Sequence, residues 1–290
     1  TVHPSGLIGG STPGPYIWTN VGSGMNAEII ALAQQGGNLY AGGVFTNAGG
    51  VAASYVARWD GSTWTSVGGG VDTSVWALVQ HGGQLYAGGK FTSAGGVSAN
   101  RIAMWNGVSW TNLGSGFDSD VIALAHDGNN LYAGGSFTNA GGVTASQVAM
   151  WNGTSWTNLG SGMNRFGYVY ALAHDGTNLY AGGIFTNAGG VNVNQIALWN
   201  GTSWTNLGSG MNPYGTVRTL LCAGGLLYAG GGFTNAGGVT VNRIAAWNGV
   251  TWMNLGSGMD NSQVSALAHE GTDLYAGGSF TTVGGMSANR

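Results

Sequence analysis

The residues best suited to chemistry in this sequence are one arginine and several tyrosines that interrupt a regular repeat. Arg218 stands where the equivalent segments have Ile30, Trp76, Ile122, Tyr170 and Ser265. A charge on a strand that should be buried must be paired or open to solvent, because an isolated buried charge is very costly. Arginine and tyrosine are also enriched in contact sites. We therefore expect Arg218 to belong to a binding site.

The segments before Tyr170 and Arg218 are the longest connections of their kind and carry further aromatic residues. They read Met163-Asn164-Arg165-Phe166-Gly167-Tyr168 and Met211-Asn212-Pro213-Tyr214-Gly215-Thr216. Loops carry function more often than the elements that they connect. Trp76 is added because it stands alone in a predicted strand. The predicted ligand-binding residues are thus Arg165, Phe166, Tyr168, Tyr170, Tyr214, Arg218 and Trp76.

An Asn or Asp follows each Gly-x-Gly-Met segment, in which Phe or Val can replace the Met, at Asn26, Asp72, Asp118, Asn164, Asn212 and Asp260. Hard cations such as Ca²⁺ take carboxylate and carbonyl oxygens, so Asp72, Asp118 and Asp260 are candidate metal ligands. An Asx turn, in which the side chain bonds the backbone two residues on, explains the same pattern. We favour the turn because only three of the six residues are charged, and we expect no metal and no cofactor.

Acid–base catalysis has a weaker signal. Glycoside hydrolysis needs a pair of carboxylates. Glu28 and Asp120 occupy equivalent places two repeats apart, which predicts a separation too wide for acid–base work. The histidines share a turn position or lie one residue beyond it, so we expect them around a ring, one per repeat and not clustered: His81, His126, His174 and His269. An enzyme is not expected.

The composition excludes several classes of protein. Charged residues make up 6% of the chain, against about 25% in an ordinary globular domain. Hydrophobic residues at 43% and aromatic residues at 11% show that this low charge does not mean disorder. A net charge of −3 cannot supply the basic surface of a nucleic-acid binder. No apolar run is long enough for a transmembrane helix, and the single Cys222 excludes an internal disulfide framework.

A repeat of 46 to 48 residues organises the chain. Leu-Tyr-Ala-Gly-Gly begins at Leu39, Leu85, Leu131, Leu179, Leu227 and Leu274. Each repeat predicts four short strands, and no segment has a sustained helical period. In the third repeat the strands are expected over 121–125, 130–137, 147–151 and 156–159. Tight turns are expected at His126-Asp127-Gly128 and Asn152-Gly153, with a loop over 138–146.

Four antiparallel strands repeated about every 47 residues are typical of a β-propeller blade. We expect an all-β, six-bladed propeller in one domain. The last repeat stops before its third strand, and residues 6–22 are expected to complete it, with a fourth strand over 17–21 that closes the ring. A piece cut from a longer array is the alternative. The blades are expected over about 27–68, 73–114, 119–160, 165–208, 215–256 and 261–290.

The repeats resemble the kelch type of β-propeller repeat. The resemblance rests on a hydrophobic-Tyr-x-Gly-Gly strand, as in Leu131 to Gly135, followed by Trp151-Asn152-Gly153 and then Trp156. The repeats are also similar to uncharacterised Gly-rich repeats in secreted and surface proteins of environmental bacteria. The kelch resemblance implies a binding scaffold. A minority of kelch relatives are copper oxidases with a Tyr–Cys cross-link, and the place of Cys222 in a hairpin does not match them.

These features predict a secreted or cell-surface module that is not an enzyme. We expect it to bind a neutral glycan or a protein partner through the face that carries the long loops. Low charge and many Gly, Asn, Ser and Thr residues suit a neutral polysaccharide. Two alternatives stay open. One is a structural subunit of a bacterial surface layer, filament or matrix, which would self-associate, and the other, less favoured, is a carbohydrate-active enzyme.

Overall fold

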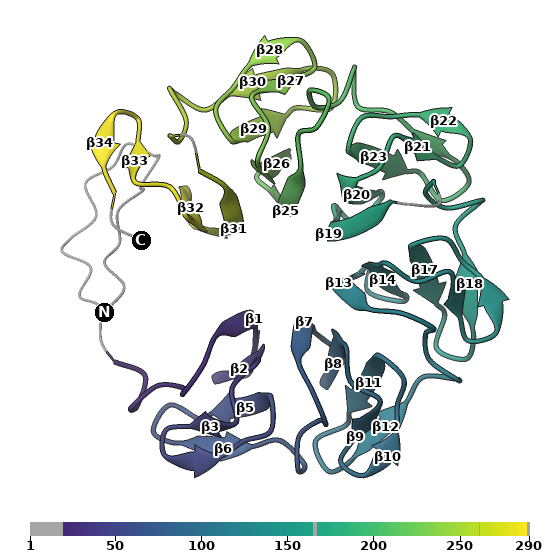
Figure 1. The fold of residues 1–290 in the computed structure, drawn as a ribbon, viewed down its shortest axis with the longest axis vertical. Coiled ribbons are helices and arrows are strands. Elements are labelled where there is room, and N and C mark those ends of the chain that lie inside the picture. The colour runs from purple at the N-terminus through teal and green to yellow at the C-terminus, as the bar shows by residue number, and fades with distance from the viewer. Residues whose placement is uncertain (1–19, 165–166, 261, 289–290) are drawn as a thin grey trace. The chain divides into compact units, whose positions relative to one another are not determined.

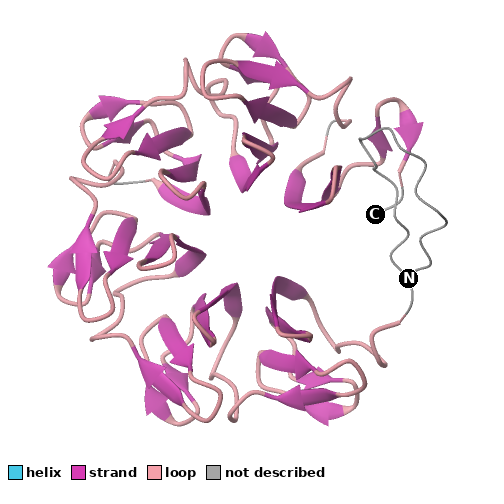
Figure 2. Cartoon of the chain, turned by 180° about the vertical axis from the view of Figure 1, so that it is seen from behind, coloured by secondary structure: helices cyan, strands magenta, loops and turns pink. Residues whose placement is uncertain are grey.

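A computed structural model describes residues 20–164, 167–260 and 262–288 of this chain. Strands and loops make up all of the described residues, and no helix is present among them (Figure 2). The predicted all-β class is confirmed. The segment expected to complete the last blade, 6–22, lies outside the described residues except for its last three positions.

The chain divides into two compact units, here called the N-terminal unit (Thr19–Gly162) and the C-terminal unit (Met163–Arg290). The N-terminal unit contains three antiparallel four-stranded sheets (Figure 1). In chain order their strands are β1 (Ile29–Gln35), β2 (Asn38–Gly43), β5 (Val56–Trp59) and β6 (Trp64–Ser66); β7 (Val75–His81), β8 (Gln84–Gly89), β11 (Ile102–Trp105) and β12 (Trp110–Asn112); and β13 (Val121–His126), β14 (Leu131–Gly135), β17 (Val148–Trp151) and β18 (Trp156–Asn158).

The C-terminal unit contains two sheets of the same kind and, within its described residues, a repeat whose main sheet has two strands, β31 and β32. The strands are β19 (Tyr168–His174), β20 (Leu179–Ile184), β23 (Ile196–Trp199) and β24 (Trp204–Thr205); β25 (Val217–Ala223), β26 (Leu226–Gly231), β29 (Ile244–Trp247) and β30 (Trp252–Asn254); and β31 (Val264–Glu270) with β32 (Asp273–Gly278). Every sheet joins its strands in chain order, as the four predicted strands of a repeat require.

A small hairpin follows the second strand of every repeat, and this corrects the loop predicted over 138–146. There β15 (Asn139–Ala140) pairs with β16 (Val143–Thr144). Gly141 and Gly142 both have positive φ, which a tight hairpin turn of this kind needs. The other hairpins are β3 (Asn47–Ala48) with β4 (Val51–Ala52), β9 (Ser93–Ala94) with β10 (Val97–Ser98), β21 (Asn187–Ala188) with β22 (Val191–Asn192), β27 (Asn235–Ala236) with β28 (Val239–Thr240), and β33 (Thr282–Val283) with β34 (Met286–Ser287).

Within each unit the sheets are packed face to face around buried aromatic and small residues. The first strands of neighbouring sheets lie against each other, as β7 does between β1 and β13. The first glycine of the Leu-Tyr-Ala-Gly-Gly motif makes room for this contact at Gly42, Gly88, Gly182 and Gly230. A Cβ atom on Gly88 would lie 2.6 Å from Cγ1 of Val121 in the next sheet, which is too close for any side chain.

The tryptophan that begins each fourth strand links its sheet to the sheet before it. Nε1 of Trp110 donates a hydrogen bond of 2.9 Å to the carbonyl oxygen of Val67, at the end of the preceding sheet. Trp156 makes the same bond to Leu113, and Trp252 to Leu207. These indoles are buried, which fits the packing role of a residue that occurs in every repeat.

Candidate functional site

Each first strand contains a β-bulge close to its start. In β25 the register shifts between Val217 and Thr219, so Arg218 is the extra residue, without a partner on β26. A bulge bends the strand and changes the direction of a side chain, and bulges are common next to functional sites. The bulged residue of every repeat is the variable one that the sequence singles out: Ile30, Trp76, Ile122, Tyr170, Arg218 and Ser265.

The second glycine of the repeated motif makes this bulge possible. A Cβ atom on Gly183 would overlap the carbonyl oxygen of Tyr168, and one on Gly231 would overlap that of Thr216. The backbones approach this closely only because glycine has no side chain. The repeated glycine thus creates one position in each first strand whose residue has no partner in the regular hydrogen-bond ladder.

Three of the predicted ligand-binding residues form a contact cluster in the C-terminal unit, here called the Tyr–Arg cluster (Tyr168, Tyr170 and Arg218). The rings of Tyr168 and Tyr170 are stacked, with centroids 5.8 Å apart and planes at 10°. Cζ of Arg218, from the neighbouring sheet, lies 4.3 Å from the centroid of the Tyr170 ring. Tyr168 is 43% exposed, while Tyr170 and Arg218 are half-buried.

The guanidinium of Arg218 has unused hydrogen-bonding capacity. Its Nε is buried, and among the described residues it has no acceptor. Contact with an aromatic face satisfies part of the charge and uses none of the N–H groups as hydrogen-bond donors. The cluster therefore combines an exposed aromatic ring with a cation whose Nε lacks a hydrogen-bond acceptor in the described part of the chain.

Tyr214 projects from the connection that leads into β25. Gly215 N donates to Asn212 O at 2.9 Å, so residues 212–215 form a β-turn with Pro213 at its second position. Tyr214 takes the third position with φ of +68°, where glycine is usual in a type II turn. Its side chain is 100% exposed. Tyr214 does not contact the Tyr–Arg cluster among the described residues, and Arg165 and Phe166 lie outside them.

Trp76, the remaining predicted ligand-binding residue, is the bulged residue of β7 in the N-terminal unit. Nζ of Lys90 lies 5.2 Å from the centroid of its ring. Lys90 directly follows β8 of the same sheet, and its side chain is exposed. The bulge at Trp76 in the N-terminal unit and the bulge at Tyr170 in the C-terminal unit therefore each place an aromatic ring in contact with a cation.

The six Asn and Asp residues act as long-range clamps, which corrects the expectation of a purely local Asx turn. Oδ1 of Asp72 accepts hydrogen bonds from the backbone N of Thr92 and Ser93, and Oδ2 accepts from the Thr92 hydroxyl. Asn164 accepts from Thr186 and Asn187 in the same way. The partners lie 20 to 23 residues along the chain, not two. Asn and Asp are interchangeable here because each offers an oxygen at this place.

These clamps affect the titration of the carboxylates. Burial alone would raise the pKa of Asp118, but hydrogen bonds from Thr138 and Asn139 outweigh it and hold the pKa below its usual range. Hydrogen bonds from Thr281 have the main effect on Asp260 and also lower its pKa. The carboxylate oxygens of Asp72 and Asp118 are thus already used by their own sheets. In the described part of the chain, no three His, Cys, Asp or Glu side chains are placed to hold a metal ion.

The histidines are not all separate, which corrects a second expectation. The rings of His81 and His126, at the ends of β7 and β13, lie 4.5 Å apart with planes at 31°. Their equivalents in the C-terminal unit are Asp175 and Cys222. The sequence missed the pair because one histidine is displaced by one residue and the contact depends on how two sheets pack.

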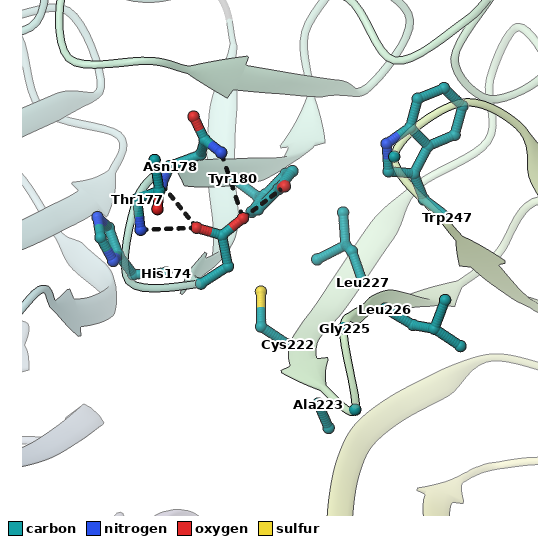
Figure 3. Close-up of a pocket in the computed structure, with 13 residues that line it drawn as sticks. His174, Thr177, Asn178, Tyr180, Cys222, Ala223, Gly225, Leu226, Leu227 and Trp247 are labelled. Atoms are coloured by element: carbon teal, nitrogen blue, oxygen red, sulfur yellow. Dashed lines mark hydrogen bonds between the residues drawn. The ribbon is translucent and has the colours of Figure 1, made fainter.

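A cavity of about 600 Å³ occurs where Cys222 replaces the larger histidine (Figure 3). Its polar lining is satisfied internally, since Asp175 accepts hydrogen bonds from Thr177, Asn178 and the Tyr180 hydroxyl. Burial, with a smaller contribution from the negative Asp175, raises the pKa of the Cys222 thiol to about 12. The thiol is therefore protonated at neutral pH and is not an activated nucleophile.

Glu28 and Asp120, the weak candidates for acid–base work, both lie in the N-terminal unit. Glu28 is exposed just before β1, and Asp120 is half-buried just before β13. Glu28 directly precedes Ile29, and Asp120 directly precedes Val121. Tyr168 takes the equivalent place before Val169. Their role in a reaction stays without support from any contact in the described residues.

No protein-family model matches this sequence, and no curated protein is similar to it. Solved structures do show a similar fold. The computationally designed protein Ika8 aligns over 89% of this chain and 82% of its own, with a TM-score of 0.52 and 17% identity. The extracellular domain of BT4673 from B. thetaiotaomicron, described as a one-component system, aligns over 88% of this chain with a TM-score of 0.58 and 15% identity.

These similarities establish the fold only: a strand-rich chain of propeller-like repeats. The aligned region covers 31% of the BT4673 chain, so this chain spans less than a third of that protein's length. The kelch resemblance stays an expectation from the motifs, since no family model supports it. Among the described residues, no helix has the length and apolar character needed to cross a membrane.

Proposed function

We propose that this chain is a non-catalytic binding module that works outside the cell and recognises a glycan. The Tyr–Arg cluster is the observation that carries the proposal. It combines a 43% exposed tyrosine ring with an arginine whose buried Nε has no acceptor in the described part of the chain. Aromatic faces and arginine forks are common elements of contact sites.

The proposed architecture is a closed, six-bladed propeller. Constant motifs build the blades, and the bulged residues differ between them, so the scaffold and the recognition surface are separate parts of each repeat. An extracellular location is supported by the extracellular domain among the similar structures.

The experiment is binding of the full chain to an array of glycans and bacterial polysaccharides, with Arg218→Ala beside it. Binding that Arg218→Ala reduces, with an unchanged circular dichroism spectrum and melting temperature, would support the proposal. No binding to any glycan would contradict it and would favour a protein partner or a structural subunit.

Lys90→Ala is the matched control, because it removes the cation from the equivalent aromatic bulge at Trp76. We expect Lys90→Ala to bind the selected glycan as the unmodified chain does. Loss of binding in Lys90→Ala but not in Arg218→Ala would move the site to the N-terminal unit. Ile122→Ala, at a bulge without a cation, controls for effects of the substitution on the bulge itself.

A further inference from the structure

We infer that the Tyr–Arg cluster recognises the carboxylate of a uronic acid within an acidic polysaccharide. This inference rests on the proposed glycan-binding function and names the chemical class of the ligand. The overall composition suggests a neutral partner, but the local geometry around Arg218 points to an anionic group.

The first step is the state of Arg218 itself. Its neighbours in β25 include Val217, which is fully buried, so the bulge places a cation at the edge of an apolar layer. Its Nε is buried without an acceptor among the described residues. A desolvated N–H group without a partner is costly. The side chain as a whole is only half-buried, so a ligand acceptor that reaches its exposed part would offset the cost of placing this cation here.

The second step is the lack of a competing acid on the described residues of the C-terminal unit. Asp175, Glu270 and Asp273 lie in or beside the turns that join first and second strands, at the opposite end of the strands from the bulges. Several residues of extended chain separate them from Arg218, and each residue adds about 3.3 Å. Asp260 precedes β31 at the nearer end. Its Oδ2 accepts both hydrogen bonds from Thr281, and its Oδ1 is buried without a partner among the described residues, so it makes no hydrogen bond with Arg218.

The third step is the fit of a carboxylate to the free edge of the guanidinium. Tyr170 contacts Arg218 through its ring, at 4.3 Å, and offers no acceptor in that contact. The guanidinium N–H groups lie in one plane and form a rigid fork, which matches the two oxygens of a carboxylate. A hydroxyl of a neutral sugar can accept only one such bond in the same direction, so it uses the fork less well.

The fourth step is the place of the sugar ring. Tyr168 is stacked on Tyr170 at 5.8 Å, and it is the more exposed of the two rings. A pyranose has an apolar C–H face that can pack on an aromatic ring. A uronic acid carries its carboxylate on the same ring as this face, so one sugar unit offers both groups that the cluster can bind.

The test is calorimetric titration of the full chain with oligosaccharides of galacturonate, of mannuronate and of glucuronate-containing units, each beside its methyl ester. The ester keeps the sugar and removes the charge. For at least one pair we expect the acid to bind about tenfold to hundredfold more tightly than the ester, as charge-assisted hydrogen bonds imply. Arg218→Ala should abolish this preference, and Arg218→Lys should restore it only in part.

Equal binding of acid and ester would overturn the inference, while the binding of both would leave the glycan-binding function standing. Tighter binding of a sulfated oligosaccharide than of every carboxylated one would also overturn it, because the anion would then be a sulfate ester. Preference for the acid that survives in Arg218→Ala would place the carboxylate elsewhere. Failure of all glycans, charged and neutral, would contradict the proposed function itself.

Discussion

Arg218 and Tyr170 are equivalent residues of neighbouring repeats, and they touch, with Cζ of the arginine 4.3 Å from the centroid of the tyrosine ring. Each is the bulged residue of its own first strand. Because β19 and β25 pack side by side, bulges in successive strands bring unpaired positions together. A site can therefore form from two repeats without any change to the ladder of either one.

Tyr170→Ala is expected to weaken binding of the glycan selected on the array by about 1–2 kcal/mol, since it removes the ring that holds the guanidinium. Tyr170→Phe keeps the ring and should bind almost as tightly as the unmodified chain. Titration calorimetry measures both. An equal loss in Tyr170→Phe would show that the hydroxyl matters and not the contact with Arg218.

Gly231→Ala is expected to destabilise the chain severely, by about 3 kcal/mol or more, because its Cβ would overlap the carbonyl oxygen of Thr216 at the bulge. Gly232→Ala is the adjacent control. A Cβ at Gly232 would lie 3.9 Å from Cγ of Gln263, which is an ordinary contact. Thermal unfolding should show little change or a slight gain for Gly232→Ala, and similar losses for both would contradict the bulge account.

Asp118→Asn is expected to make the acid side of the stability profile less steep. The folded pKa of Asp118 is lowered, so its contribution is present above the unfolded pKa and is lost as the pH falls through the folded pKa. Asn keeps the acceptor oxygen, as Asn164 does at the equivalent place, and cannot titrate. Denaturant unfolding between pH 5 and pH 2 measures the slope, with about 1 kcal/mol at stake.

An unchanged slope in Asp118→Asn would show that other carboxylates dominate acid unfolding. The double variant with Asp72→Asn then separates the contribution of the clamp carboxylates to acid unfolding from the contribution of the carboxylates in turns. Asp60 and Asp127 are the main competitors. Hydrogen bonds from Thr63 and Ser62 lower the pKa of Asp60 strongly, and hydrogen bonds from Asn130 and its neighbours outweigh the burial of Asp127 and do the same.

Trp110→Phe is expected to lower the free energy of unfolding by about 2 kcal/mol or more, because it removes both a buried hydrogen bond to the Val67 carbonyl oxygen, which then keeps only the bond from Gly70 N, and part of a buried ring. Trp105→Phe is the matched control. The Trp105 ring lies 5.6 Å from that of Trp110, and its indole N–H has no acceptor among the described residues. Chemical denaturation of both variants compares the loss of the bond with the loss of ring volume alone.

Closure of the ring stays a prediction, and Gly277 can test it. A Cβ at Gly182 would lie within 2.4 Å of Val217, whereas one at Gly277 meets only Ala266 at 3.9 Å. If the ring closes, Ile29 should take the place that the valines take elsewhere. Gly277→Ala would then destabilise the chain as Gly182→Ala does. A neutral Gly277→Ala would indicate that this face of the last sheet stays open.

The strands could be predicted closely from the sequence, since β13, β14, β17 and β18 agree with the expected ranges within two residues. Their signals are local: apolar runs, Asp-Gly and Asn-Gly turns. The hairpin of β15 and β16 escaped prediction because two-residue strands are too short to show a period. The Gly134-Gly135 pair predicts a close backbone approach or a bulge, and the structure confirms it, with the extra residue Ile122 on the first strand opposite the glycines.

Non-local relationships were the hardest to predict. The clamp of Asp72 reaches Thr92, twenty residues away, and the sequence offered only the local Asx turn. The pair of His81 and His126 depends on the packing of two sheets. The contact of Arg218 with Tyr170 was easier to anticipate, because both residues break the same column of the repeat.

The bulge also bears on how such a protein can change its ligand. Its geometry depends on the second glycine of the motif, where a side chain would overlap the backbone of the first strand, while the bulged residue itself makes no ladder pairing. One residue per repeat can therefore be substituted without loss of a ladder pairing, and the remaining residues of the repeat maintain the fold. A chain of this kind can diversify its specificity by point mutation or by exchanging repeats, and a library limited to the bulge positions would sample new ligands without a search for new folds.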